Sequence, residues 1–173
     1  MNIINKVLIQ KGQQLLKNPS TISLKVVNTL LPTIVPFNQS HHIKINSITS
    51  NKITTFLPLR RSNKNHVATM HACAIATLGE FTAGILLMRE VPLDKYRMIL
   101  QELSTDYHFQ AKEDLFANVT LPAGFADDLK ILNETGILSI PLVTSITQQD
   151  GKKIATTTTL WHLKQWSLTH TAK

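Results

Sequence analysis

The feature that most constrains this chain is an apolar run of 17 residues, Ala72 to Met88, with one carboxylate, Glu80, at its centre. Such a run is long enough for a helix of about five turns. It only reaches the lower end of the roughly 17 to 25 residues that cross a bilayer, and a central charge is costly there. We therefore predict a core helix from about His71 to Met88 rather than a membrane span.

Before this helix, the sequence alternates between apolar and polar residues. Ile43 and Ile45 alternate with polar neighbours, and residues 53–59 do the same after the Ser50-Asn51 break. A period of two indicates strands, and the polar break between them indicates a turn. We predict a β-hairpin here.

After the helix, further strand patterns follow. They cover residues 97–111, 114–121, 137–147 and 152–163, with a short helix at 125–133 that Gly136 stops. Asp150-Gly151 between two β-rich runs is a strong hairpin signal. One apolar helix among antiparallel strands predicts an α+β fold, in which a curved sheet wraps around the helix.

The first part of the chain has a helical pattern instead. Residues 3–17 combine apolar spacing with lysines, which predicts an amphipathic helix, and a second helix is predicted between the Asn18-Pro19-Ser20 break and Pro32. We predict a helical extension at 1–35 and one main domain at 36–173. The extension is expected to pack on the domain or a partner, although a basic amphipathic helix also suits peripheral contact with a membrane.

Charge is distributed unevenly along the chain. Residues 1–79 contain nine basic and no acidic residues, whereas all eleven acidic residues lie at or after Glu80. A basic region of this kind attracts phosphates, acidic lipid or nucleic acid, or simply forms a solvated surface. Aromatic residues make up only 6% of the chain and no nucleic-acid motif is present, so we do not expect nucleic acid as a partner.

The cysteine and histidine content argues against metal chemistry. Cys73 is the only cysteine, so no intramolecular disulfide is possible, and the seven histidines form no recognised ligand spacing. We expect no metal and no cofactor. A single cysteine, together with the lack of a secretory signal pattern, predicts a cytoplasmic protein.

Glu80 is the only charged residue in the apolar run, and the role of its carboxylate needs an explanation. Its helical neighbours three and four residues away are Ala76, Thr77, Ala83 and Gly84, none of which carries a positive charge. A buried carboxylate needs a partner from elsewhere, or its pKa rises. One interpretation is that Glu80 forms an ion pair across the fold or reaches solvent at a subunit edge. The other is that it is a catalytic carboxylate, acting as a general base or nucleophile.

The start of the same helix also contains backbone groups that are suited to binding a substrate oxygen. Backbone N–H groups around Ala72 and Cys73 lie in its first turn, where no intrahelical acceptor exists and the helix dipole is positive. Such groups can polarise a carbonyl oxygen. Asn65 and His71 lie just upstream, where they either take part in a site or simply shape the turn and cap the helix.

The spacing of these residues resembles that of the hotdog-fold thioesterases, especially the phenylacetyl-CoA and 4-hydroxybenzoyl-CoA thioesterase families. Asn65 and His71 are six residues apart, Glu80 follows His71 by nine, and the segment Leu-Gly-Glu-Phe-Thr-Ala matches the acidic segment of those families. Pro36-Phe37-Asn38 is similar to a thioesterase-like branch of the superfamily. The resemblance differs at Ala72-Cys73, where the families often have Gly-Gly.

The resemblance implies hydrolysis of an acyl thioester carried on coenzyme A or an acyl carrier protein. Glu80 is then the general base or nucleophile, and the Ala72 N–H, with Cys73 beside it, forms the oxyanion site. Asn65 orients water or substrate from a neighbouring subunit, and His71 shapes the helix start. A homodimer or dimer of dimers is implied.

Three basic residues precede the helix and suit the phosphates of coenzyme A, or else form a solvated loop: Arg60, Arg61 and Lys64. Two other functions remain open. A non-catalytic acyl-binding or interaction protein is compatible with the missing glycines, and a hotdog dehydratase or hydratase would use a similar tunnel, although no matching hydratase motif is present.

Overall fold

The computed structural model describes residues 3–169. Residues 1–2 of the predicted helical extension and residues 170–173 of the predicted main domain lie outside the described residues. The described helices are α1 (Ile3–Lys17), α2 (Thr21–Ile34), α3 (Ala72–Glu90) and α4 (Phe125–Thr135). The described strands are β1 (Lys44–Ile48), β2 (Lys52–Leu57), β3 (Tyr96–Tyr107), β4 (Leu115–Thr120), β5 (Ile137–Thr147) and β6 (Lys153–Gln165). Short 3-10 helices lie at η1 (Pro36–His41), η2 (Arg61–Asn63) and η3 (Trp166–Leu168).

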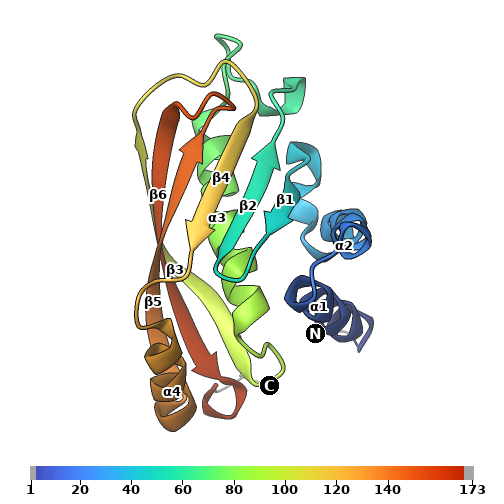
Figure 1. The fold of residues 1–173 in the computed structure, drawn as a ribbon, viewed down its shortest axis with the longest axis vertical. Coiled ribbons are helices and arrows are strands. Elements are labelled where there is room, and N and C mark those ends of the chain that lie inside the picture. Colours follow the sequence, from blue (N-terminus) through green and yellow to red (C-terminus); the bar gives the residue numbers. More distant parts are fainter. Residues whose placement is uncertain (1–2, 170–173) are drawn as a thin grey trace.

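The six strands form one antiparallel sheet in the order β1-β2-β4-β5-β6-β3, with α3 against one of its faces (Figure 1). The predicted α+β class and the curved sheet around one long helix are therefore confirmed. Both predicted hairpins are present as β1–β2 and β5–β6. In the second turn Gly151 adopts a φ of +87°, a conformation that glycine permits and other residues rarely adopt.

The interface between α3 and the sheet is apolar, with a few buried threonines. Leu78, Leu86 and Leu87 are completely buried. Thr82 Oγ1 lies 2.6 Å from Thr55 Oγ1 of β2, which joins the helix to the sheet. A Cβ on Gly79 would collide with the side chain of Thr157 in β6, so glycine is required at this point of closest approach.

α3 is also long and apolar enough to cross a membrane by length and composition, but 67% of its apolar window is buried inside the protein. It is the central helix of the domain core. This agrees with the interpretation of the 17-residue run as a core helix.

The predicted end of the second helix is wrong. α2 continues to Ile34, with Pro32 in its last turn. Proline lacks an N–H and removes one helical hydrogen bond, but the next turn is still closed by the Val35 N–H, which donates to Leu31 O at 2.8 Å. Leu31 is buried, so its packing also favours keeping this turn helical.

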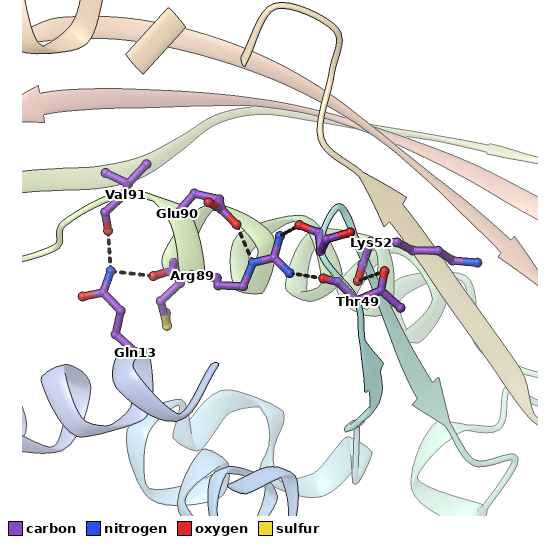
Figure 2. A network of polar contacts seen from close by, with 8 residues as sticks. Gln13, Thr49, Lys52, Arg89, Glu90 and Val91 are labelled. Atoms are coloured by element: carbon purple, nitrogen blue, oxygen red, sulfur yellow. Dashed lines mark hydrogen bonds and ion pairs between the residues drawn. The ribbon is translucent and has the colours of Figure 1, made fainter. Parts of the chain in front are cut away.

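The N-terminal helices are attached to the C-terminal end of α3 (Figure 2). Gln13 of α1 donates from Nε2 to Met88 O at 2.8 Å and to Val91 O at 2.6 Å. These carbonyls lie at a helix end, where intrahelical donors run out. The amide of Gln13 therefore satisfies groups that the helix alone leaves unpaired.

Arg89 closes the same end of α3. Only 5% of this residue is exposed, and it pairs with Glu90. Its guanidinium also donates to Thr49 O at 2.6 Å and to Ser50 O at 3.0 Å in the β1–β2 turn. The buried charge is thus paired with a carboxylate and hydrogen-bonded through all three of its nitrogens, as buried charges require.

Candidate active site

One stripe of α3 is not covered by the sheet. Cys73 is exposed, and Ala76, Thr77 and Glu80 are half-buried, whereas most of the helix beyond them is buried. These positions are three, four and seven residues apart, so they lie on one helical face. The central helix is therefore not enclosed on all sides, and Glu80 lies on its open face.

Glu80 has no ion-pair or hydrogen-bond partner in the described part of the chain. The two ion pairs found there join Arg89 to Glu90 and Lys130 to Asp127. Burial raises the pKa of the Glu80 carboxyl above its ordinary value. The alternative of an ion pair across the fold is thus not met within residues 3–169.

Gly84 lies one turn after Glu80, and the ring of Trp161 packs against it. A Cβ on residue 84 would lie 4.0 Å from Glu80 Oε1 and 3.2 Å from the Trp161 ring. Trp161 is 5% exposed, and its Nε1 donates to Thr159 Oγ1 at 3.0 Å. A large apolar ring therefore packs against α3 one turn after Glu80, and burial is the cause of the raised pKa of the Glu80 carboxyl.

His71 is the N-cap of α3. Its Nδ1 accepts a hydrogen bond from the Cys73 N–H at 3.1 Å, and its carbonyl accepts from the Ile75 N–H at 3.1 Å. The Cys73 N–H is thus already used. Neither the Ala72 N–H nor the Ala74 N–H has an acceptor among the described residues, but only Ala72 is exposed, so its N–H is the accessible free donor at this helix start.

Tyr107 at the end of β3 also contacts this helix start. Its hydroxyl donates to Ala72 O at 2.9 Å. Burial first, and then the nearby Cys73, raise the pKa of the Tyr107 phenol, so the proton that it donates is retained at neutral pH. Tyr107 thereby holds the peptide next to the free donor.

Asn65 is tied into its own loop. Its Oδ1 accepts from the backbone N–H groups of Val67 and Thr69, both at 3.1 Å, and its Nδ2 donates to Thr69 Oγ1 at 2.9 Å. The second N–H of this amide has no acceptor among the described residues. In the single chain Asn65 therefore shapes the loop that leads to α3 and keeps one donor free.

Asn63 is a positioning residue that sequence reasoning missed. It is fully buried, and its carbonyl accepts from the His71 N–H at 2.7 Å. Its side chain donates to the carbonyls of His41 and Pro58, and its Oδ1 lies 2.9 Å from His41 Nδ1. An Asn in a polar loop carries no signal of such burial, since the partners come from distant segments.

The predicted basic residues are only partly brought together. Arg60 and Arg61 line an open groove of about 590 Å³, whose lining is Ser40, His42, Arg60, Arg61 and Ser62. Lys64 is exposed beside this groove but does not line it. Among residues 3–169, no three His, Cys, Asp or Glu side chains are grouped as metal ligands.

The comparisons with known proteins agree with this architecture. The family model for a domain of unknown function, DUF4442, matches residues 24–163. No curated protein matches the chain.

Solved structures give the fold. One is a protein of unknown function from Pseudomonas aeruginosa named a probable thioesterase: 21% identity, TM-score 0.74, covering 82% of this chain and 95% of that one. A mutant of a second thioesterase from the same organism has 12% identity and a TM-score of 0.68, with coverage of 85% and 95%. A mutant thioesterase enzyme from Staphylococcus aureus has 13% identity and a TM-score of 0.63, with coverage of 75% and 99%. The chain thus has the hotdog fold that the resemblance implied.

Proposed function

Because the chain belongs to the family described as a domain of unknown function, DUF4442, and shares its fold with proteins named thioesterases, we propose that it hydrolyses an acyl thioester. The observation that carries the proposal is the state of Glu80. Its carboxylate has no partner among the described residues, lies on the open face of α3 and has a raised pKa. A carboxylate of this kind is suited to proton transfer or nucleophilic attack.

The chemistry follows from these groups. As a general base, Glu80 takes a proton from water while the water oxygen attacks the thioester carbonyl carbon, and the Ala72 N–H stabilises the oxyanion. The C–S bond then breaks. Glu80 returns its proton to the departing sulfur, so the thiol is released. As a nucleophile, Glu80 instead forms an acyl anhydride, releases the thiol, and is regenerated by water.

The two routes differ in where a water oxygen ends up. In a single turnover in ¹⁸O-labelled water, the nucleophilic route regenerates Glu80 with label in its carboxylate whenever water attacks the carboxyl carbon of Glu80. General-base catalysis places the label only in the released acid. Label found by mass spectrometry in the peptide that contains Glu80 after this turnover identifies the nucleophilic route.

Helix geometry supports a site shared between two copies of the chain. Ala72 and Glu80 are eight residues apart, which is about 12 Å along a helix axis. Both must come within about 3 Å of the same reacting carbonyl or its attacking water, which one helix does not allow. Two antiparallel α3 helices remove the difficulty, because the Ala72 of one then lies beside the Glu80 of the other.

The edge of the sheet supports the same assembly. β3 is an end strand, and its Leu103 and Tyr107 are 44% and 48% exposed. An exposed apolar strand edge beside an open helix face is a surface that a second copy covers with twofold symmetry. A homodimer satisfies this requirement, and two such dimers can associate without changing the site. Asn65 keeps one amide N–H for water or substrate in this arrangement.

The groove at Arg60 and Arg61 is the proposed contact for the phosphates of coenzyme A or of a carrier protein's prosthetic arm, with Lys64 beside it. The segment that holds these residues leads directly into α3 through the Asn63 contact to His71. Positive charge therefore lies on the same side as the free Ala72 N–H. Arg suits phosphate because its planar group donates two parallel hydrogen bonds.

A panel of acyl-CoA and acyl-carrier thioesters tests the function directly. We expect turnover of at least one of them, and a loss of about 1,000-fold or more in Glu80→Gln, which is about 4 kcal/mol of transition-state stabilisation. Glu134→Gln, which removes an exposed carboxylate of α4, serves as the control and should keep full activity. Equal turnover by wild type and Glu80→Gln would contradict the proposal.

A non-catalytic acyl-binding protein is the second candidate. It is favoured by the Ala72 methyl group, which stands beside the accessible Ala72 N–H, and by the capping of the Cys73 N–H, which removes a second donor from the exposed helix start. This candidate predicts an acyl ligand that co-purifies with the protein, together with no hydrolysis across the whole panel. Mass spectrometry of the purified protein before and after incubation decides between the two.

A further inference from the structure

A second basic cluster lies on the face of the sheet that points away from α3. Arg97 of β3 is directly opposite Lys164 of β6, and Ile99 is opposite His162 in the next outward row. The residues between them, Met98 and Leu163, point inward to the core side. Three nitrogen-bearing side chains from two neighbouring strands therefore share one small area.

These side chains surround a groove of about 360 Å³. The groove is lined by Arg97, Ile99, His162, Lys164 and Thr169. Ile99 is 42% exposed and gives the groove an apolar wall beside the cationic groups. On its far side, His162 Nδ1 lies 3.3 Å from Ser139 Oγ of β5, and if that hydroxyl donates, Nε2–H remains a donor for the groove.

The positive charges in the groove are not neutralised within the described residues. Like charges directly opposite one another on antiparallel strands destabilise a sheet. Neither Arg97 nor Lys164 belongs to an ion pair there, and the nearest outward acid along β3, Glu102, lies opposite Leu160 without pairing to them. The outward neighbour of Lys164 on β5 is Ile137, which is apolar.

The groove is also separate from the candidate active site. Arg97 lies near the start of β3 and Lys164 near the end of β6, at the lower end of the sheet in Figure 1. α3 ends just before β3, so this is the C-terminal end of the helix, whereas Arg60, Arg61 and the free Ala72 N–H lie at its N-terminal end. In one chain the two basic grooves therefore belong to opposite ends of the fold.

We propose that the groove formed by Arg97, His162 and Lys164 binds the phosphate group of a ligand whose apolar part rests on Ile99. Arg97 offers the paired donors that a phosphate accepts, and Lys164 adds a point charge across the strand pair. The bound anion removes the like-charge repulsion between the two strands, so binding stabilises the sheet. The inference does not depend on thioester hydrolysis.

The test is binding to the full-length Glu80→Gln protein, so that catalysis plays no part. Three probes are compared: inorganic phosphate, adenosine 3′,5′-bisphosphate, and vesicles of phosphatidylglycerol with phosphatidylcholine. Backbone amide shifts at residues 97–99 and 162–164 report the soluble probes, and co-sedimentation reports the vesicles. Binding by the nucleotide identifies a soluble phosphoester as the source, and binding by vesicles alone identifies a lipid headgroup.

Arg97→Gln/Lys164→Gln is the test variant, and it should weaken binding by at least about tenfold. Lys112→Gln/Lys153→Gln removes the same charge from exposed positions elsewhere and should bind as the parent does. The test variant should also unfold at the same or a higher temperature without ligand, because the repulsion is gone. Equal weakening in both double variants, or no probe that shifts the amides of the groove or sediments the protein, overturns the proposal.

Discussion

The two ends of α3 differ in how completely their polar groups are used. At the C-terminal end, Arg89 pairs with Glu90 and donates to two backbone carbonyls, and Gln13 satisfies the last carbonyls of the helix. In the N-terminal half, Glu80 and the Ala72 N–H have no partners among the described residues. Two glutamates ten residues apart on one helix thus have opposite surroundings.

This difference separates stability from function. A closed polar network holds secondary elements together, and breaking it leaves buried groups unsatisfied. Open groups at a helix start contribute nothing to the isolated chain and persist at a free energy cost, as groups in functional sites do. Variants at the closed end should therefore change unfolding, whereas variants at the open end should change turnover.

At the open end, Ala72→Pro is expected to have the largest effect after Glu80→Gln. Ala72 is the first residue of α3, where proline fits because that N–H has no helical acceptor. His71 already has the extended backbone that proline requires before it, with φ −69° and ψ 138°. Removing this single donor should lower turnover about 100- to 1,000-fold, as for other oxyanion donors.

The matched control at this position is Ala72→Gly. It keeps the N–H and removes the methyl group that stands at the helix start, so turnover should stay the same or rise. Kinetics with one substrate and circular dichroism of both variants make the comparison. Loss of activity in Ala72→Gly equal to that in Ala72→Pro would contradict the role of the N–H.

Arg89→Met should have the largest effect at the closed end. It leaves Glu90 and the carbonyls of Thr49 and Ser50 without their donor, which is expected to cost about 3 kcal/mol of unfolding free energy. Urea denaturation at fixed protein concentration measures it, and turnover per folded molecule should not change.

The control for Arg89 is the other ion pair. Lys130 and Asp127 are both 73% exposed, so Lys130→Met should cost at most about 1 kcal/mol. Equal destabilisation by the two variants would mean that Arg89 does not close the helix end as described.

A smaller effect concerns pH and Glu80. Burial raises its pKa in the folded state, so the folded protein binds this proton more tightly than the unfolded chain does. Wild type and Glu80→Gln should be equally stable at low pH, where the carboxyl is protonated in both states. As pH rises through the unfolded pKa, wild type should lose stability relative to the variant, until the pH exceeds the folded pKa.

Urea denaturation of both proteins between acidic and neutral pH measures this difference. Glu134→Gln provides the comparison for an exposed carboxylate and should show no such trend. A wild type that gains stability over Glu80→Gln as pH rises would indicate a favourable partner for the carboxylate, and the comparison between the two ends of α3 would fail.

Much of the fold was predictable, because its signals are local. The apolar run of α3, the alternation in β1 and β2, the Asp150-Gly151 turn and the stop at Gly136 all act within a few residues. The end of α2 was misplaced, because the packing of Leu31 and the Val35 hydrogen bond outweigh the preference of Pro32 against helix.

The site was less predictable, because its surroundings come from distant segments. Trp161 packs against Gly84, one turn after Glu80, and Tyr107 holds the peptide of Ala72 from 35 residues away. Asn63 is buried by contacts to η1 that no local pattern indicates. The spacing of Asn65, His71 and Glu80 predicted the region of the candidate site, but not these neighbours.

The central claim is that Glu80 of one copy acts with the Ala72 N–H of another. The measurement that tests it most directly is the turnover of a purified mixed dimer, made by co-expressing Glu80→Gln and Ala72→Pro chains with different tags. One of its two sites is then intact, so turnover should recover to about half of the wild-type value, although each parent alone is nearly inactive. A mixed dimer as inactive as its parents would contradict the account.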